Sequence, residues 1–141
     1  MTRDEKVKTE VAALARDCGV RYRLTRDWAY MGSCCPIKKI VTLNLDCTYV
    51  EILSTFFHEV GHVEARKKGK FKVYHSVAEF RSRKERMIFN RTALRAELWV
   101  EDWAEKEFLK RFPKKKYSRT YGYDDESKLA VNKECQIGIF A

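Results

Sequence analysis

Residues 56–66 read FFHEVGHVEAR and set His58 and His62 four positions apart, with Glu59 directly after the first histidine. On an α-helix, side chains four positions apart share one face, so both imidazoles could bind the same metal ion. Glu59 would project about 100° around the helix, beside the open position of such an ion, where a general base is useful. The stretch therefore predicts a helix that carries a metal site. The alternative is a charged helix whose histidines have no ligand role.

The residues around this motif support a helix. Thr48 and Glu51 have the spacing of a capping box, which predicts a helix that begins there and ends near Gly69. Its apolar side chains fall on one arc, roughly opposite the histidines: Leu53, Phe56, Val60 and Val63. Small residues share the histidine side and would leave space above the imidazoles: Ser54, Gly61 and Ala65. We therefore expect a helix that is packed from behind and forms the floor of a cleft.

Elements upstream of the motif are predicted by local patterns. Residues 3–18 follow a capping box and show helical periodicity, and Gly19 sits where that helix would end. Residues 20–24 alternate apolar and basic side chains, which predicts a short strand. Residues 32–33, Gly-Ser, are typical of a loop. Residues 37–45 are rich in β-branched side chains and form the best strand candidate.

Elements downstream are less regular. Residues 70–91 are ambiguous, and we expect a short extended piece at Phe71–Tyr74 followed by a basic helix. Residues 92–111 predict a long helix that Pro113 stops. Residues 136–140 predict a final strand.

Length and composition indicate one folded domain of the α+β class. The chain has 141 residues, of which 45% are hydrophobic and 13% aromatic. We expect residues 1–116 to form this domain and residues 117–141 to form a C-terminal extension packed on it. Because the N-terminus lacks an apolar signal region and no apolar run approaches the ~20 residues that span a bilayer, we expect a cytoplasmic location without membrane insertion. Five cysteines should then remain reduced thiols: Cys18, Cys34, Cys35, Cys47 and Cys135.

The charge balance is basic. Lysine and arginine number 29 against 20 acidic residues, a formal net charge of +9. Much of the excess lies in residues 66–91 and in Lys114–Lys116. This favours an acidic partner such as nucleic acid, although a well-solvated surface explains the same composition and no nucleic-acid-binding motif is present.

A catalytic zinc commonly has three protein ligands and one open position, so a third ligand is needed. The pattern HExxHxxGxxH does not occur, because Arg66, Lys67 and Lys68 occupy its last positions, where a third histidine would stand. His75 is one candidate. The carboxylates of the helix predicted at residues 92–111 are the other.

Two of those carboxylates fall within the apolar arc of that helix. On a helical wheel, Glu97 lies near Val100 and Ala104, and Glu101 is only about 40° from Glu97. An unpaired ion on a core-facing arc is very unfavourable, so a cation should face this side. An ion pair with Arg91 or Arg95 is the alternative. Two further carboxylates should lie at the rim or in solvent: Asp102 and Glu105.

The segment IKKIVTLNLDCTYVEILSTFFHEVGH, residues 37–62, resembles the ImmA/IrrE-like zinc metallopeptidases. These belong to the gluzincin clan, which includes the very small minigluzincins. The resemblance extends over roughly residues 3–112 and implies a zincin-like domain. In that fold an N-terminal helix and a short mixed or antiparallel sheet accompany the HExxH helix, and a later glutamate helix supplies a ligand.

The later stretch ELWVEDWA, residues 97–104, matches the ExxxD or ExxxN frame of the glutamate helix, with Glu101 in the place of Asp or Asn. The resemblance implies that His58, His62 and Glu97 bind one zinc ion. It also implies that Glu101 accepts a hydrogen bond from a ligand histidine and orients it. Glutamate at this second position departs from the family pattern, as does the long basic insertion between the two helices.

The implied activity is that of a hydrolase, a protease that cleaves peptide bonds in a protein or peptide substrate through zinc-activated water, with Glu59 as general base. A second group normally stabilises the oxyanion, and four residues are candidates although each is also explained as a surface or packing residue: Tyr74, His75, Tyr121 and Tyr123. The strand at residues 40–45 could bind an extended substrate by adding it to the edge of the sheet.

Three other interpretations stay open. The chain could resemble SprT-like proteases that act on DNA-bound protein, with His75 as the third ligand and the basic insertion on the nucleic acid. It could instead be a non-enzymatic, basic nucleic-acid-binding or regulatory module with a structural metal site, although such a site needs no base like Glu59. In a third hypothesis, the C-terminal tail closes the site, with Cys135 as a thiolate ligand.

Overall fold

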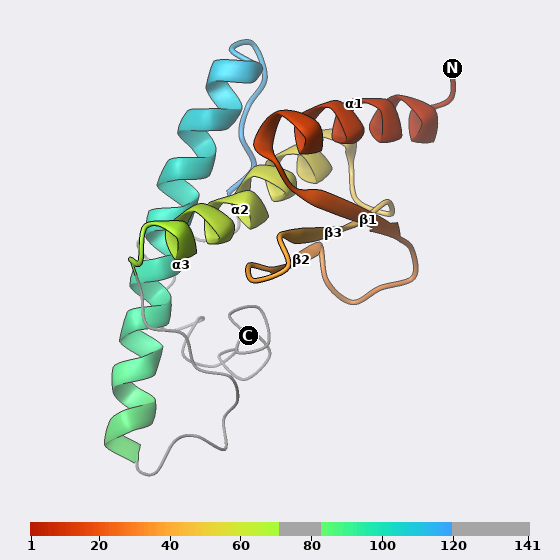
Figure 1. Cartoon of the computed structure of the whole chain (residues 1–141). Coiled ribbons are helices and arrows are strands. Elements are labelled where there is room, and N and C mark those ends of the chain that lie inside the picture. Colours follow the sequence, from red (N-terminus) through yellow and green to blue (C-terminus); the bar gives the residue numbers. More distant parts are fainter. Residues whose placement is uncertain (71–82, 120–141) are drawn as a thin grey trace.

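The computed structural model describes residues 1–70 and 83–119 and has the α+β architecture that we expected (Figure 1). Its elements in chain order are α1 (Arg3–Cys18), β1 (Arg21–Thr25), β2 (Gly32–Cys35), β3 (Ile40–Asn44), α2 (Tyr49–Lys67) and α3 (Arg83–Arg111). The extended piece expected at Phe71–Tyr74 and the strand expected at Gln136–Phe140 lie outside the described residues.

Both predicted capping boxes are present and fix where the helices begin. In α1 the Thr2 hydroxyl accepts a hydrogen bond from the backbone N–H of Glu5, and the Glu5 carboxylate accepts one from the backbone N–H of Thr2. Thr48 and Glu51 repeat this arrangement at the start of α2. Gly19 ends α1 in the left-handed conformation, with φ +67°, as its position predicted.

The sheet is mixed, with strand order β1-β3-β2. β1 pairs with β3 in parallel, and β2 pairs with β3 antiparallel. The central strand is therefore β3, whose two edges are both occupied. The expectation that residues 40–45 offer a sheet edge to a substrate is wrong, because neighbouring strands already use the hydrogen-bonding groups on both sides of β3.

β2 corrects the expectation of a loop at residues 32–33. Gly32 pairs with Leu43, and Cys35 pairs with Ile40. Glycine is rare in strands, but here the close approach of α2 requires it. A Cβ atom built on Gly32 would stand 2.4 Å from Cγ2 of Thr55, a distance that real side chains do not reach. Tertiary packing has thus overridden a local turn signal.

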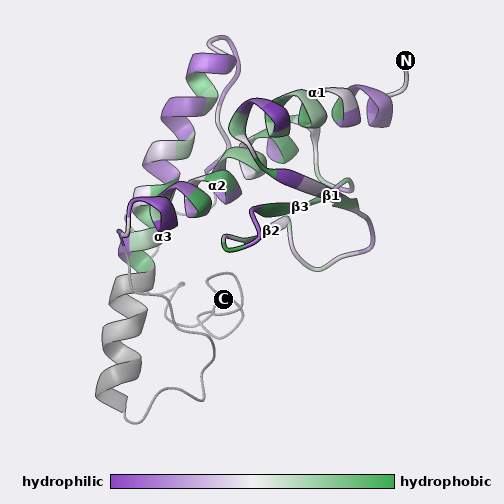
Figure 2. Ribbon diagram, viewed as in Figure 1, coloured by the Kyte–Doolittle hydropathy of each residue, from purple (hydrophilic) through white to green (hydrophobic). Residues whose placement is uncertain are grey.

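α2 lies between the sheet and α3 and is the most buried element (Figure 1). Figure 2 shows hydrophobic positions in α1, β3 and α2, and buried residues of these elements form one core cluster. The core side chains without exposed surface include members from all three helices, among them Val11, Leu53, Phe56 and Phe108. None of the helices in the described ranges combines the length and the apolar character that a membrane span requires.

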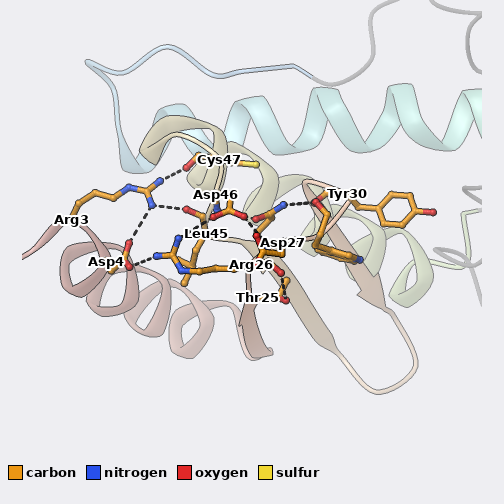
Figure 3. Close-up of polar contacts among 11 residues, drawn as sticks. Arg3, Asp4, Thr25, Arg26, Asp27, Tyr30, Leu45, Asp46 and Cys47 are labelled. Carbon is orange, nitrogen blue, oxygen red and sulfur yellow. Dashed lines mark hydrogen bonds and ion pairs between the residues drawn. The ribbon is translucent and has the colours of Figure 1, made fainter.

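Arginine contacts fix the turn that leads into α2 (Figure 3). The Arg3 guanidinium, in the first turn of α1, donates hydrogen bonds to the backbone carbonyls of Leu45, at 2.6 Å, and of Cys47. An ion pair between Arg26 and Asp4 joins the loop after β1 to the same turn of α1. The start of α2 is therefore held against both the sheet and α1.

Candidate metal centre

Two helices bring the expected metal ligands together. His58 and His62 lie on α2, and Glu97 lies on α3. The helices approach closely at Gly61, where an added Cβ atom would stand 2.7 Å from Cγ1 of Val100. This corrects one expectation: Gly61 leaves room for α3 and not for open space above the imidazoles.

Ser54, which was also expected to border open space, is covered as well. Its hydroxyl oxygen accepts a hydrogen bond from the backbone N–H of Ser118, at 2.9 Å. The chain that follows α3 therefore returns to α2 and packs on this part of the helix. The small residues of α2 serve close packing, and the expected cleft floor is not built from them.

The donor atoms of His58, His62 and Glu97 converge. All three side chains are buried, and one ligand atom from each lies within 4.8 Å of the others. Nε2 of His58 is 2.9 Å from Oε2 of Glu97, and Nε2 of His62 is 3.5 Å from Oε1. Two donors on one tetrahedral zinc ion stand roughly 3.3 Å apart, so these separations need little adjustment to bind a divalent ion.

The carboxylate of Glu97 is the most informative member of this group. Glu97 has no exposed surface, and neither of its oxygens accepts a hydrogen bond of good geometry from the described residues. A buried carboxylate in that condition is unfavourable unless a cation faces it. The three side chains therefore fit a metal ion by their positions and by their donor atoms. A bound cation would also balance the negative charge of the buried Glu97 carboxylate.

The charges of the group are strongly coupled. Burial alone would raise the pKa of Glu97, but the histidines beside it hold that pKa well below its usual range. Burial opposes the charged form of His58, yet the carboxylates of Glu97 and Glu101 outweigh it and raise the pKa of His58 well above its ordinary value.

Glu101 lies on the far side of His58 from Glu97. Its Oε1 is 2.6 Å from Nδ1 of His58, and Glu101 has no exposed surface. Because a carboxylate can only accept, Nδ1 carries a hydrogen. In the neutral imidazole, the form that binds a metal, Nε2 then has the lone pair and faces Glu97. This is the arrangement in which an outer carboxylate orients a metal-binding histidine.

Glu59 is buried between α2 and β2. It is 3% exposed, and its Oε2 accepts no hydrogen bond from the part of the chain that the structure describes. Burial raises the pKa of Glu59, although the two histidines lower it in part. Gly32 of β2 borders this carboxylate, since a Cβ atom there would stand 3.5 Å from Cγ of Glu59.

Tyr117 belongs to the site and was missed in the sequence. Its hydroxyl donates a hydrogen bond to Oε1 of Glu101, at 2.7 Å, and its ring packs against Phe108. It follows Pro113 in a polar, lysine-rich stretch where no periodicity marks a buried residue. A lone aromatic residue among lysines was the only available signal, and it does not identify a partner.

Other expected residues lie elsewhere. Arg95 is exposed, whereas Glu97 and Glu101 contact histidine, and the side chain of Arg91 is outside the described set. Asp102 and Glu105 do lie at the rim, where Arg119 pairs with both. Five further candidates are outside the described residues: Tyr74, His75, Tyr121, Tyr123 and Cys135.

The four cysteines in the described ranges form no disulfide: Cys18, Cys34, Cys35 and Cys47. Cys34 is the most buried of them, and burial together with the charge of Glu59 raises the pKa of its thiol far above the usual range.

Comparison of the chain with protein-family models, curated proteins and solved structures finds no match.

Proposed function

We propose that this protein is a zinc metallopeptidase of the gluzincin type, similar to the ImmA/IrrE-like enzymes, which cleaves peptide bonds in a cytoplasmic protein or peptide. The observation that carries the proposal is the buried group of His58, His62 and Glu97, because its donors converge and its carboxylate lacks hydrogen bonds of its own among the described residues. Two histidines and a glutamate are the ligand set of catalytic zinc in known peptidases, which leave a fourth position open.

The neighbouring residues have roles that follow from their positions. Zinc bound to this group would lower the pKa of a water molecule and polarise a substrate carbonyl. The carboxylate of Glu59 would accept the proton of the attacking water and pass it to the departing amine. Its pKa, which burial raises, suits a group that must both take and return a proton. Glu101 would keep the imidazole of His58 in the ligand tautomer.

The sheet suggests where an extended peptide would lie. Peptides often bind by adding a strand to an exposed sheet edge. β3 is central, so the edge on the side of the site belongs to β2, whose Gly32 borders Glu59. We therefore place a substrate strand along β2 in this proposal.

Replacement of Glu59 by glutamine tests the proposed base. The variant should keep zinc, because Glu59 is not among the three converging side chains, and should lose about 10²–10⁴-fold in rate. The assay would measure zinc content by atomic emission and cleavage of a mixture of unstructured peptides by mass spectrometry. Glu64→Gln, on the same helix and pairing with Lys67, is the matched control and should keep full activity.

Full activity of Glu59→Gln with zinc retained would contradict the proposal. So would a zinc-loaded wild-type protein that cleaves none of the peptides. Salt-dependent binding of nucleic acid without any cleavage would instead favour the non-enzymatic, regulatory interpretation of the basic surface.

A further inference from the structure

Tyr117 and His58 contact the same oxygen atom. Oε1 of Glu101 accepts a hydrogen bond from the Tyr117 hydroxyl at 2.7 Å and lies 2.6 Å from Nδ1 of His58. Tyr117 is 6% exposed, and its ring lies 5.4 Å from the ring of Phe108, measured between centroids. The hydroxyl therefore belongs to a buried series of contacts that links Tyr117, after the end of α3, through Glu101 to His58, one of the proposed metal ligands.

The two residues that follow Tyr117 are held by contacts with α2 and with α3. The N–H of Ser118 donates to the Ser54 hydroxyl of α2. Arg119 forms ion pairs with Asp102, at 3.2 Å, and Glu105, at 2.9 Å, both on α3. Residues 117–119 thus contact both helices that supply the metal ligands, and they hold the tyrosine hydroxyl at Glu101.

The chemistry of Glu101 gives this contact a consequence. A carboxylate without exposed surface keeps one orientation when donors hold its oxygen atoms. Each of the two contacts at Oε1 restricts the rotation of this carboxylate. A carboxylate fixed at Nδ1 of His58 orients the ring so that Nε2 points to where the three ligand atoms converge.

We propose that Tyr117 is a positioning residue whose hydroxyl fixes Glu101 and, through it, His58, and so raises the affinity of the centre for zinc. This inference rests on the proposed metal centre. It assigns the segment after α3 a part in metal binding, although none of its residues is among the three that converge.

Tyr117→Phe removes the hydroxyl and keeps the ring that packs against Phe108. We expect zinc to bind at least about 10-fold more weakly, since loss of an outer partner of a ligand histidine typically has an effect of 10–100-fold. Affinity would be measured by competition with a chromophoric chelator, and folding by urea unfolding of the metal-free protein. Tyr49→Phe, at the start of α2, is the matched control and should bind zinc as the wild type does.

A double-mutant cycle tests whether Tyr117 acts through Glu101. In a Glu101→Ala background, Tyr117→Phe should change zinc affinity by less than about 2-fold, because the intermediate carboxylate is gone. An equal loss in both backgrounds would overturn the inference and assign the effect to packing. If the wild type binds zinc and Tyr117→Phe binds it as tightly, the role of Tyr117 fails while the centre stands. If the wild type binds no zinc, both fail.

Discussion

Gly61 of α2 and Val100 of α3 are in such close contact that a single added carbon atom at Gly61 would stand 2.7 Å from the valine Cγ1. The ring of Trp103 would be 3.3 Å away from the same atom. This contact lies between His58 and His62 in the sequence of α2 and between Glu97 and Glu101 in that of α3. The spacing of the two helices and the separation of the candidate metal ligands are therefore set by the same contact.

Gly61→Ala should both destabilise the protein and weaken zinc binding. Overpacking of a core contact typically costs about 1–3 kcal/mol, and here relief of the clash moves α3 away from the histidines. Urea unfolding and zinc competition would measure the two effects. Gly19→Ala is the control: its φ of +67° makes alanine strained, but nothing lies within 4 Å of the added atom, so its zinc affinity should not change. Unchanged zinc affinity in Gly61→Ala would contradict this account of the helix contact.

Glu97→Gln should remove one of the three proposed metal ligands with little change in the shape of the side chain. We expect zinc affinity to fall by more than about 100-fold, beyond the usual effect of an outer partner. Glu105→Gln, which alters a rim ion pair with Arg119 on the same helix, should retain the wild-type affinity. His75→Ala separates the competing interpretation: strong zinc loss in that variant, with Glu97→Gln unaffected, would favour His75 as the third ligand.

The effect of zinc on stability should depend on pH in a defined direction. The folded-state pKa of His58 lies well above the ordinary 6.5, because the nearby carboxylates outweigh the effect of burial. A raised histidine pKa stabilises the metal-free fold fully below the unfolded value, and this stabilisation is lost as pH rises through the folded value. Zinc requires the neutral imidazole and so binds more tightly as pH rises.

We therefore expect the increase in Tm on adding zinc to grow from about pH 6 to about pH 8, with proton release on binding. Thermal unfolding with and without zinc, in buffers that do not bind the metal, measures the first effect, and calorimetry in two buffers of different ionisation enthalpy measures the second. A zinc-induced shift that is the same at every pH would contradict the assignment of His58 as a ligand.

Gly32→Ala should destabilise the contact between β2 and α2. The added atom would stand 2.4 Å from Cγ2 of Thr55, a clash expected to cost about 1–3 kcal/mol. Thr55→Ser removes Cγ2 and keeps the hydroxyl, so it should recover part of the lost stability in the double variant. The backbone carbonyl of Thr42, 3.1 Å from the added atom, limits that recovery. A double variant no more stable than Gly32→Ala would show that Thr55 is not the obstacle.

The helices were predictable because their signals are local. Thr2 with Glu5, and Thr48 with Glu51, form the capping boxes that their spacing indicated, and Gly19 takes the left-handed conformation. The strand GSCC was not predictable from propensity, because its pairing to β3 and the contact of Gly32 with α2 are tertiary. The parallel pairing of β1 with β3 likewise has no local signal.

In the candidate site, too, the residues with a local sequence signal were predictable and those placed by tertiary contacts were not. The burial of Glu97 and Glu101 followed from helical periodicity, since both lie on the arc of Val100 and other core residues. Tyr117 could not be found in this way, because it reaches Glu101 from the irregular segment that follows α3. Periodicity identifies which side chains a helix buries, but it does not identify which neighbour covers them.

One zinc ion bound by two histidines of α2 and one glutamate of α3 would act as a cross-link between segments far apart in the chain. An ion that binds only the folded state stabilises it in proportion to the logarithm of the free ion concentration. In a cell, chains deprived of zinc would open more often and be degraded sooner. The abundance of such a protein would therefore follow zinc supply, independently of any substrate.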